Sequence, residues 1–197
     1  MKKIEKGTPG YLDYAHKVKL MVVSILAAVI ILLLIISMFL SDFGSGICKI
    51  AAILLVLPAS NFGVTYIAMF PYHSRGRETY DILCEKAKGK RVLAELAITN
   101  PKGPTVSIPY AVIAPDRVLC YYERIGKKDK LSKMPSALEL SSYLEGRLRL
   151  SEVDMPVEVL TDESRFMKLA PGLRSLKTEE ELVLAQRAAS ALLANSF

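Results

Sequence analysis

The chain has 197 residues, of which 51% are hydrophobic, and a formal net charge of +6. Residues 1–19 hold five basic and two acidic side chains, while residues 75–197 hold 20 basic and 17 acidic ones. The second region lacks the concentrated positive charge of nucleic-acid-binding domains, so nucleic acid is not an expected partner. Three cysteines without C-x-x-C spacing argue against a disulfide scaffold and a zinc site.

Two uncharged runs occupy residues 20–40 and 50–70, and each has 21 residues. As an α-helix each run would rise about 31 Å, close to the roughly 30 Å hydrocarbon thickness of a bilayer. A soluble core helix of this length would carry a polar face, and neither run has one. A signal peptide fits the first run badly, because signal cores have about 7–15 apolar residues. We therefore predict a transmembrane helical hairpin, with the lipid bilayer as its partner.

The distribution of basic residues predicts the orientation of this hairpin. Five lysines precede the first run, six lysines and arginines lie between residues 75 and 91, and residues 41–49 contain one lysine. Cytoplasmic flanks are enriched in lysine and arginine, so we expect a multi-pass cell-membrane protein with both termini in the cytoplasm. Residues 1–19 then form a basic cytoplasmic or interfacial arm, residues 41–49 an extracytoplasmic loop, and residues 75–197 a cytoplasmic domain.

Asn61 is the most polar side chain of the second run. Its amide needs a hydrogen-bond partner in hydrocarbon, and two partners remain open: a carbonyl of its own helix freed by Pro58, or a second copy of the chain. The second alternative would make the hairpin a homo-oligomerisation element. Neither run contains Asp, Glu, Lys, Arg or His, which argues against ion-coupled transport.

Residues 75–197 alternate between helical and strand patterns. A helical period is predicted to begin at Ser74, and three β-rich segments follow at 91–99, 105–114 and 117–123. Turn residues separate these segments, which predicts a meander. Capping boxes at Ser136 and Thr178 open two further helices, with a fourth strand at 155–160 between them. The predicted order is α-β-β-β-α-β-α, a small α/β (α+β) domain whose sheet offers a docking surface.

One segment of this domain carries motifs of a known family. Residues 107–124 form a predicted strand with Pro109 near its start, a proline-containing turn before Asp116, and a second strand that ends in Tyr122-Glu123-Arg124. The preceding helix opens with Gly76-Arg77-Glu78. Residues 76–124 thereby resemble the nuclease-related NERD family, which is restriction-endonuclease-like. The resemblance implies metal-dependent phosphodiester hydrolysis, with carboxylates on Mg²⁺ and a lysine beside the attacking water.

The chain departs from that family at the positions that carry the chemistry. Pro109 occupies the place of an early acidic residue, and Tyr-Glu-Arg at 122–124 replaces acid-x-Lys. A register slip of one residue would bring Glu123 to the metal, with Asp116 on the turn before it. Such a slip turns Glu123 to the opposite face of the sheet. The sequence favours a degenerate scaffold with no metal and no cofactor, and Asp116 with Glu123 is the alternative catalytic pair.

A basic loop follows this strand. It contains four lysines: Lys127, Lys128, Lys130 and Lys133. Two interpretations stay open, a solvated loop and a membrane contact with anionic headgroups.

Two functional classes follow from these patterns. The first is a membrane-anchored, non-enzymatic interaction or scaffold module that binds an unknown cytoplasmic protein. The second is a membrane-tethered, nuclease-like enzyme. Nucleophile–histidine chemistry inside the domain would have to use His73, because no histidine follows it. Three acidic side chains within reach of one metal ion would favour the enzyme.

Overall fold

The computed structural model describes residues 4–40, 42–98, 105–124, 134–194 and 196. The chain divides into two compact parts. Residues 13–70 form one part, called the hairpin below, and residues 1–12 together with 71–197 form the other, called the α/β domain. The hairpin is therefore inserted into the sequence of the α/β domain.

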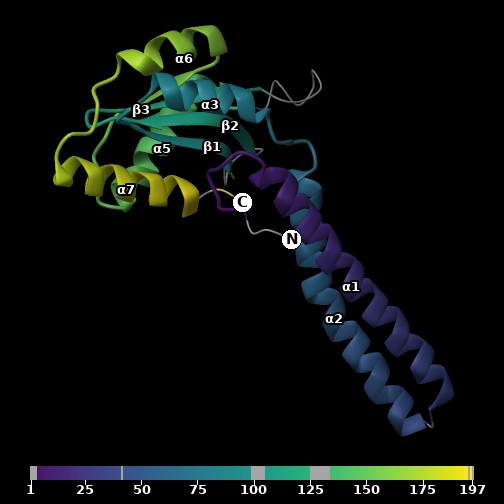
Figure 1. Ribbon diagram of the computed structural model, residues 1–197. Coiled ribbons are helices and arrows are strands. Elements are labelled where there is room, and N and C mark those ends of the chain that lie inside the picture. The colour runs from purple at the N-terminus through teal and green to yellow at the C-terminus, as the bar shows by residue number, and fades with distance from the viewer. Residues whose placement is uncertain (1–3, 41, 99–104, 125–133, 195, 197) are drawn as a thin grey trace. The chain divides into compact units, whose positions relative to one another are not determined.

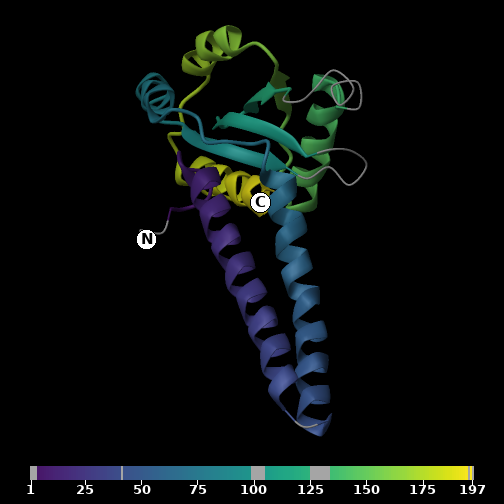
Figure 2. The ribbon, with the colours of Figure 1, turned by 90° about the vertical axis from the view of Figure 1, so that its right-hand side faces the viewer.

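Two helices, α1 (Tyr11–Phe39) and α2 (Asp42–Met69), make up the hairpin and run antiparallel (Figure 2). Both are long and apolar enough to cross a membrane. Only 6% of the most apolar 18-residue window of each helix is buried, whereas a core helix of a soluble protein is mostly buried. The predicted pair of long apolar helices is thus confirmed.

The helices extend beyond the apolar runs that predicted them. α1 begins at Tyr11, and α2 begins at Asp42, so residues 42–49 are helical although the sequence predicted a loop. Apolarity identifies a stretch of bilayer length, whereas hydrogen bonding and capping determine where a helix ends. Residues 11–19, predicted as part of an interfacial arm, likewise form the first turns of α1.

The open end of the hairpin is held by side chains of both helices. The rings of His16 and Tyr66 meet edge to face, with centroids 6.0 Å apart. Lys19 Nζ lies 2.8 Å from the sulfur of Met69. Pro58 lies inside α2 without interrupting it, and Ser60 Oγ donates to the carbonyl of Val56 at 2.8 Å.

A four-stranded sheet forms the centre of the α/β domain. Its strands β1 (Arg91–Ile98), β2 (Val106–Ile113), β3 (Val118–Glu123) and β4 (Val157–Leu160) lie in this order. The first three are an antiparallel meander, as predicted, and β4 runs parallel to β3. All eight residues of β2 are buried, as expected for a central strand with both faces covered.

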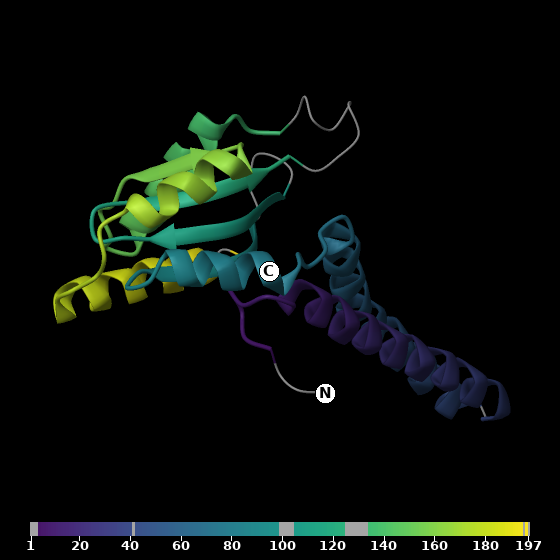
Figure 3. The same ribbon diagram turned by 45° about the horizontal axis from the view of Figure 1, so that its top comes forward.

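Helices cover both faces of this sheet (Figures 1 and 3). α3 (Arg77–Lys86) and α6 (Glu163–Leu169) pack on one face through Leu83 and Phe166. α5 (Ala137–Leu150) and α7 (Glu179–Ala194) pack on the other through leucine and alanine side chains. Helices therefore cover the sheet faces, and the expectation that the sheet offers a docking surface stays a prediction.

The predicted element order lacks one helix. α6 follows β4 directly and leads into a short 3₁₀ turn, Ala170–Gly172, so two helices rather than one come after the last strand. Asp162 caps α6 by accepting the backbone N–H groups of Ser164 and Arg165. α6 has seven residues, which are too few to display a helical period in the sequence. Asp162 at its amino terminus was the sequence signal for this helix. Both predicted capping boxes, at Ser136 and Thr178, are present.

The amino-terminal arm packs on the edge strand β1. The carbonyl of Gly7 accepts the N–H of Ala94 at 2.8 Å, and Lys6 Nζ donates to the carbonyl of Ser196 at 3.1 Å. Ser196 in turn bridges to Ile98 on β1. Residues from both ends of the chain thus cover the outer edge of the sheet, which limits pairing with other chains there.

Candidate functional site

The carboxyl ends of the parallel strands β3 and β4 hold a cluster of charged side chains. β3 ends at Glu123, and β4 ends just before Asp162 and Glu163. Arg75 reaches this edge from the segment between α2 and α3. Ligands of open α/β sheets commonly bind outside the carboxyl ends of strands, so we treat this edge as the candidate site.

Arg75 binds both carboxylates of the cluster. Its Nη2 donates to Glu123, and its Nη1 donates to Glu163 at 3.0 Å. The guanidinium also lies over the ring of Tyr121, 5.5 Å from the centroid. Burial opposes the charge of Arg75, but Glu123 and Glu163 outweigh that effect and raise its pKa. One fixed cation therefore occupies the space between two carboxylates.

A buried tyrosine lies near this cluster. Tyr110 on β2 is 1% exposed. Burial raises its pKa, while the Thr79 hydroxyl beside it and the positive charge of Arg75 act in the opposite direction. The hydroxyl therefore stays protonated at neutral pH and cannot serve as a base there.

Glu95 is a second buried charged residue of the α/β domain. It lies on β1 with φ of 55° and is 5% exposed. Its carboxylate accepts the N–H of Gly10 at 2.8 Å and the N–H of Leu12 at 3.0 Å, at the start of α1. Ser74 Oγ donates to the same carboxylate at 2.9 Å. A helix amino terminus favours negative charge, so Glu95 caps α1 from a strand far away in sequence.

The structure does not bring Asp116 and Glu123 together. Asp116 precedes β3 and Glu123 ends it, so the length of this strand separates them by roughly 20 Å. Asp116 instead pairs with Arg117 at 3.0 Å, and Arg117 also reaches Glu158 at 3.5 Å. Within the described part of the chain, no three carboxylates offer oxygens within 4.8 Å of one another.

The other predicted site residues lie elsewhere. Lys127, Lys128, Lys130 and Lys133 fall outside the described residues. Asn61 is exposed on α2, and no bond of its amide is found among the described residues; its carbonyl accepts Thr65 Oγ1 at 2.8 Å.

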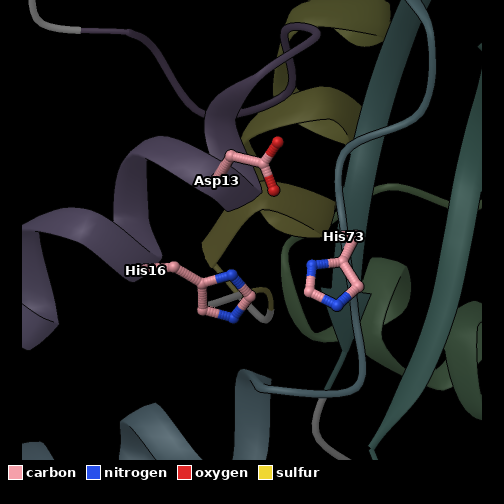
Figure 4. A group of neighbouring side chains, drawn as sticks. All are labelled: Asp13, His16 and His73. Atoms are coloured by element: carbon pink, nitrogen blue, oxygen red, sulfur yellow. The ribbon is translucent and has the colours of Figure 1, made fainter.

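The two histidines of the chain, together with Asp13, are drawn in Figure 4. Asp13 and His16 project from the first turns of α1, three residues apart and therefore on one helix face. His73 belongs to the α/β domain, in the segment that follows α2. These side chains are thus assigned to separate parts of the chain.

Comparison of the chain with protein-family models, curated proteins and solved structures finds no match.

Sequence reasoning missed the residues that complete the cluster. Arg75 was counted only as a positive flank of the hairpin, and Glu163 and Glu95 were not singled out. Arg75 lies 48 residues from Glu123 and 88 from Glu163, so no local pattern links them. The sequence did offer a signal for Glu95, which stands alone as an acidic residue in the apolar segment 91–98. Charged residues are rarely buried without a partner, so its position predicts a binding partner for the carboxylate.

Proposed function

We propose that α1 and α2 anchor the protein in a cell membrane as a multi-pass hairpin, with both termini in the cytoplasm. Exposed apolar helices of bilayer length support this anchor. The excess of basic residues on the two flanks supports the orientation. Leu12 and Pro71 belong to the same compact part, which supports an exit of both hairpin ends on the same side of the membrane.

We further propose that the α/β domain is a non-enzymatic interaction module for a cytoplasmic protein. The observation that carries this proposal is Arg75, which binds both carboxylates at the strand ends. Hydrolysis of the NERD type would need carboxylates on a metal ion, and Glu123 belongs to the alternative pair that the sequence offered, Asp116 with Glu123. A guanidinium held between Glu123 and Glu163 favours a scaffold, and a nuclease-like enzyme is the alternative.

A groove beside the other edge strand, β4, is the surface we assign to docking. It has a volume of about 330 Å³ and is bounded by β4 and α5. Leu138, Val157 and Val159 line the groove. The side chain of Leu138 is 78% exposed. An exposed leucine over an apolar groove fits a partner with an apolar side chain.

Topology can be tested by thiol labelling of intact cells. An impermeant maleimide added outside should modify Cys48 and spare Cys84 and Cys120. A Ser196→Cys variant should also be spared at its new thiol. Labelling of that thiol from outside would overturn the orientation.

Docking can be tested by photo-crosslinking in cells. Leu138 and Leu150 are equally exposed at 78%, but only Leu138 lines the groove. A benzoylphenylalanine at position 138 should give a protein adduct that the same residue at position 150 does not. Equal adducts, or none at 138, would argue against docking in this groove.

A further inference from the structure

We infer that a second pocket of the α/β domain binds a phosphate-bearing organic ligand. The pocket lies between the amino-terminal arm, the end of α3 and the start of β1, and has a volume of about 560 Å³. All residues that line it belong to the α/β domain. The site is separate from the Arg75 cluster and does not depend on the proposed function.

Positive charge dominates the lining of this pocket. Four of its residues are basic and one, Glu5, is acidic; the basic residues are Lys6, Lys88, Lys90 and Arg91. Among the described residues, no carboxylate lies within salt-bridge distance of Lys88 or Arg91. Both side chains are exposed, so their charges are available to an anion. Lysine and arginine in a concave site are the usual protein contacts for phosphate.

Two of these basic residues are fixed by contacts that build the pocket. Lys6 Nζ donates to the carbonyl of Ser196 at 3.1 Å, and Lys90 Nζ donates to the carbonyl of Pro171 at 3.0 Å. The arm that carries Lys6 is itself held by the bond between Ala94 and Gly7. The wall on this side is therefore ordered before any ligand arrives, which lowers the entropic cost of binding.

The rest of the lining indicates that the ligand has more than a phosphate group. Ala87, Val92, Leu93 and Leu193 contribute apolar surface. A volume of this size is typical of sites for small organic molecules, and is larger than a single phosphate needs. The phosphate group would contact Lys88 and Arg91, and a carbon body would lie against the apolar wall. A soluble organic phosphate and the headgroup region of an anionic phospholipid share this chemistry.

Cys84 provides a direct readout, because it lines the pocket and is partly exposed. The experiment uses the full chain with Cys48→Ser in an uncharged detergent, at pH 8.5. Two probes are compared, glycerol 3-phosphate and short-chain dihexanoyl phosphatidic acid. At a probe concentration of about ten times Kd, about one chain in ten has an empty pocket, so maleimide labelling of Cys84 should slow about tenfold.

Matched charge variants separate a specific site from general attraction. Lys88→Glu with Arg91→Glu should abolish the protection of Cys84. Arg165→Glu with Lys168→Glu changes the net charge by the same amount, but on α6 and away from the pocket. This variant should keep the protection of Cys84. Protection by both probes identifies a soluble organic phosphate as sufficient, and protection by the phospholipid alone identifies a headgroup. The inference would be overturned if neither probe protects Cys84. It would also be overturned if protection survives Lys88→Glu with Arg91→Glu.

Discussion

Glu95 is a buried charged residue at which even a conservative substitution should cost stability. Its carboxylate accepts three donors while 5% exposed. Glu95→Gln keeps one acceptor oxygen and turns an amide N–H₂ toward a backbone N–H, so we expect a loss of about 2–3 kcal/mol. Urea unfolding of the full chain in detergent measures this. Glu145→Gln is the control, because Glu145 accepts the N–H of Val157 at 3.0 Å; equal losses would contradict the argument.

Gly7 has a backbone conformation and surroundings that disfavour a residue with a side chain. Its φ is +82°, and an added Cβ would lie 2.9 Å from Leu193 Cδ2 and 3.2 Å from Leu93 Cδ2. Gly7→Ala should cost about 1–2 kcal/mol from the left-handed backbone alone, and the clash should detach the arm. Trypsin should then cleave after Lys6 faster than in the unmodified chain.

Gly146→Ala serves as the control for this experiment. Gly146 lies in α5 with nothing within 4 Å of an added Cβ, so alanine there should stabilise the helix by about 1 kcal/mol. Unchanged cleavage after Lys6 in Gly7→Ala would show that the arm does not depend on this turn.

At the scale of elements, the capping box of α7 should give the chain a defined acid sensitivity. Hydrogen bonds from the backbone N–H groups of Lys177 and Thr178 lower the pKa of Glu181 from 4.5. A carboxyl group whose pKa is lowered by folding stabilises the folded state above its unfolded pKa, and this contribution is lost as pH falls through the folded value.

Glu181→Gln should therefore lower the Tm at pH 6 and approach the unmodified chain at pH 3. Glu180→Gln removes the same charge from the same turn but leaves the N–H bonds of Lys177 and Thr178 to Glu181 in place, so its Tm difference should stay small throughout. A Glu181→Gln difference that is constant from pH 6 to pH 3 would contradict the pKa argument.

α2 offers an element-scale test of self-association. Asn61 is exposed on this helix, and an interhelical amide contact in a membrane is worth roughly 0.6–2 kcal/mol. If the Asn61 amide bonds a second copy of the chain, Asn61→Leu should shift the detergent-solubilised chain toward monomer, as measured by light scattering. Ser60→Ala is the control, because Ser60 bonds Val56 of its own helix. An unchanged oligomer distribution in Asn61→Leu would confine Asn61 to its own helix.

The elements themselves were largely predictable, because their signals are local. The capping boxes at Ser136 and Thr178, the turn before β3 and the apolar runs each lie within a short window of sequence. The missing element, α6, is short and is marked only by Asp162. The charged contacts were not predictable, because Arg75–Glu163 and Glu95–Gly10 join residues more than 80 positions apart. Only the fold brings such pairs together.

At the scale of the whole molecule, the hairpin interrupts an otherwise continuous domain. Residues 4–12 supply a wall of the basic pocket and cover β1, and residues 71–76 supply Tyr72, Ser74 and Arg75 to the same domain. Both flanks of the hairpin are therefore structural parts of the α/β domain. A fragment that begins at residue 75 would lose contacts that hold the sheet edge, so functional assays need the full chain.

The whole-molecule prediction is that this full chain does not hydrolyse nucleic acid. Phosphate backbones are bound chiefly by concentrated lysine and arginine, and the charge of residues 75–197 is nearly balanced. The purified chain in detergent should leave plasmid and single-stranded DNA intact with Mg²⁺ or Mn²⁺. Arg75→Ala should also be inactive, because removing the guanidinium frees Glu123 and Glu163 but the described residues supply no third carboxylate within reach. Cleavage by either form that disappears on adding Glu123→Gln would show that Glu123 serves a metal site, and the scaffold proposal would then be wrong.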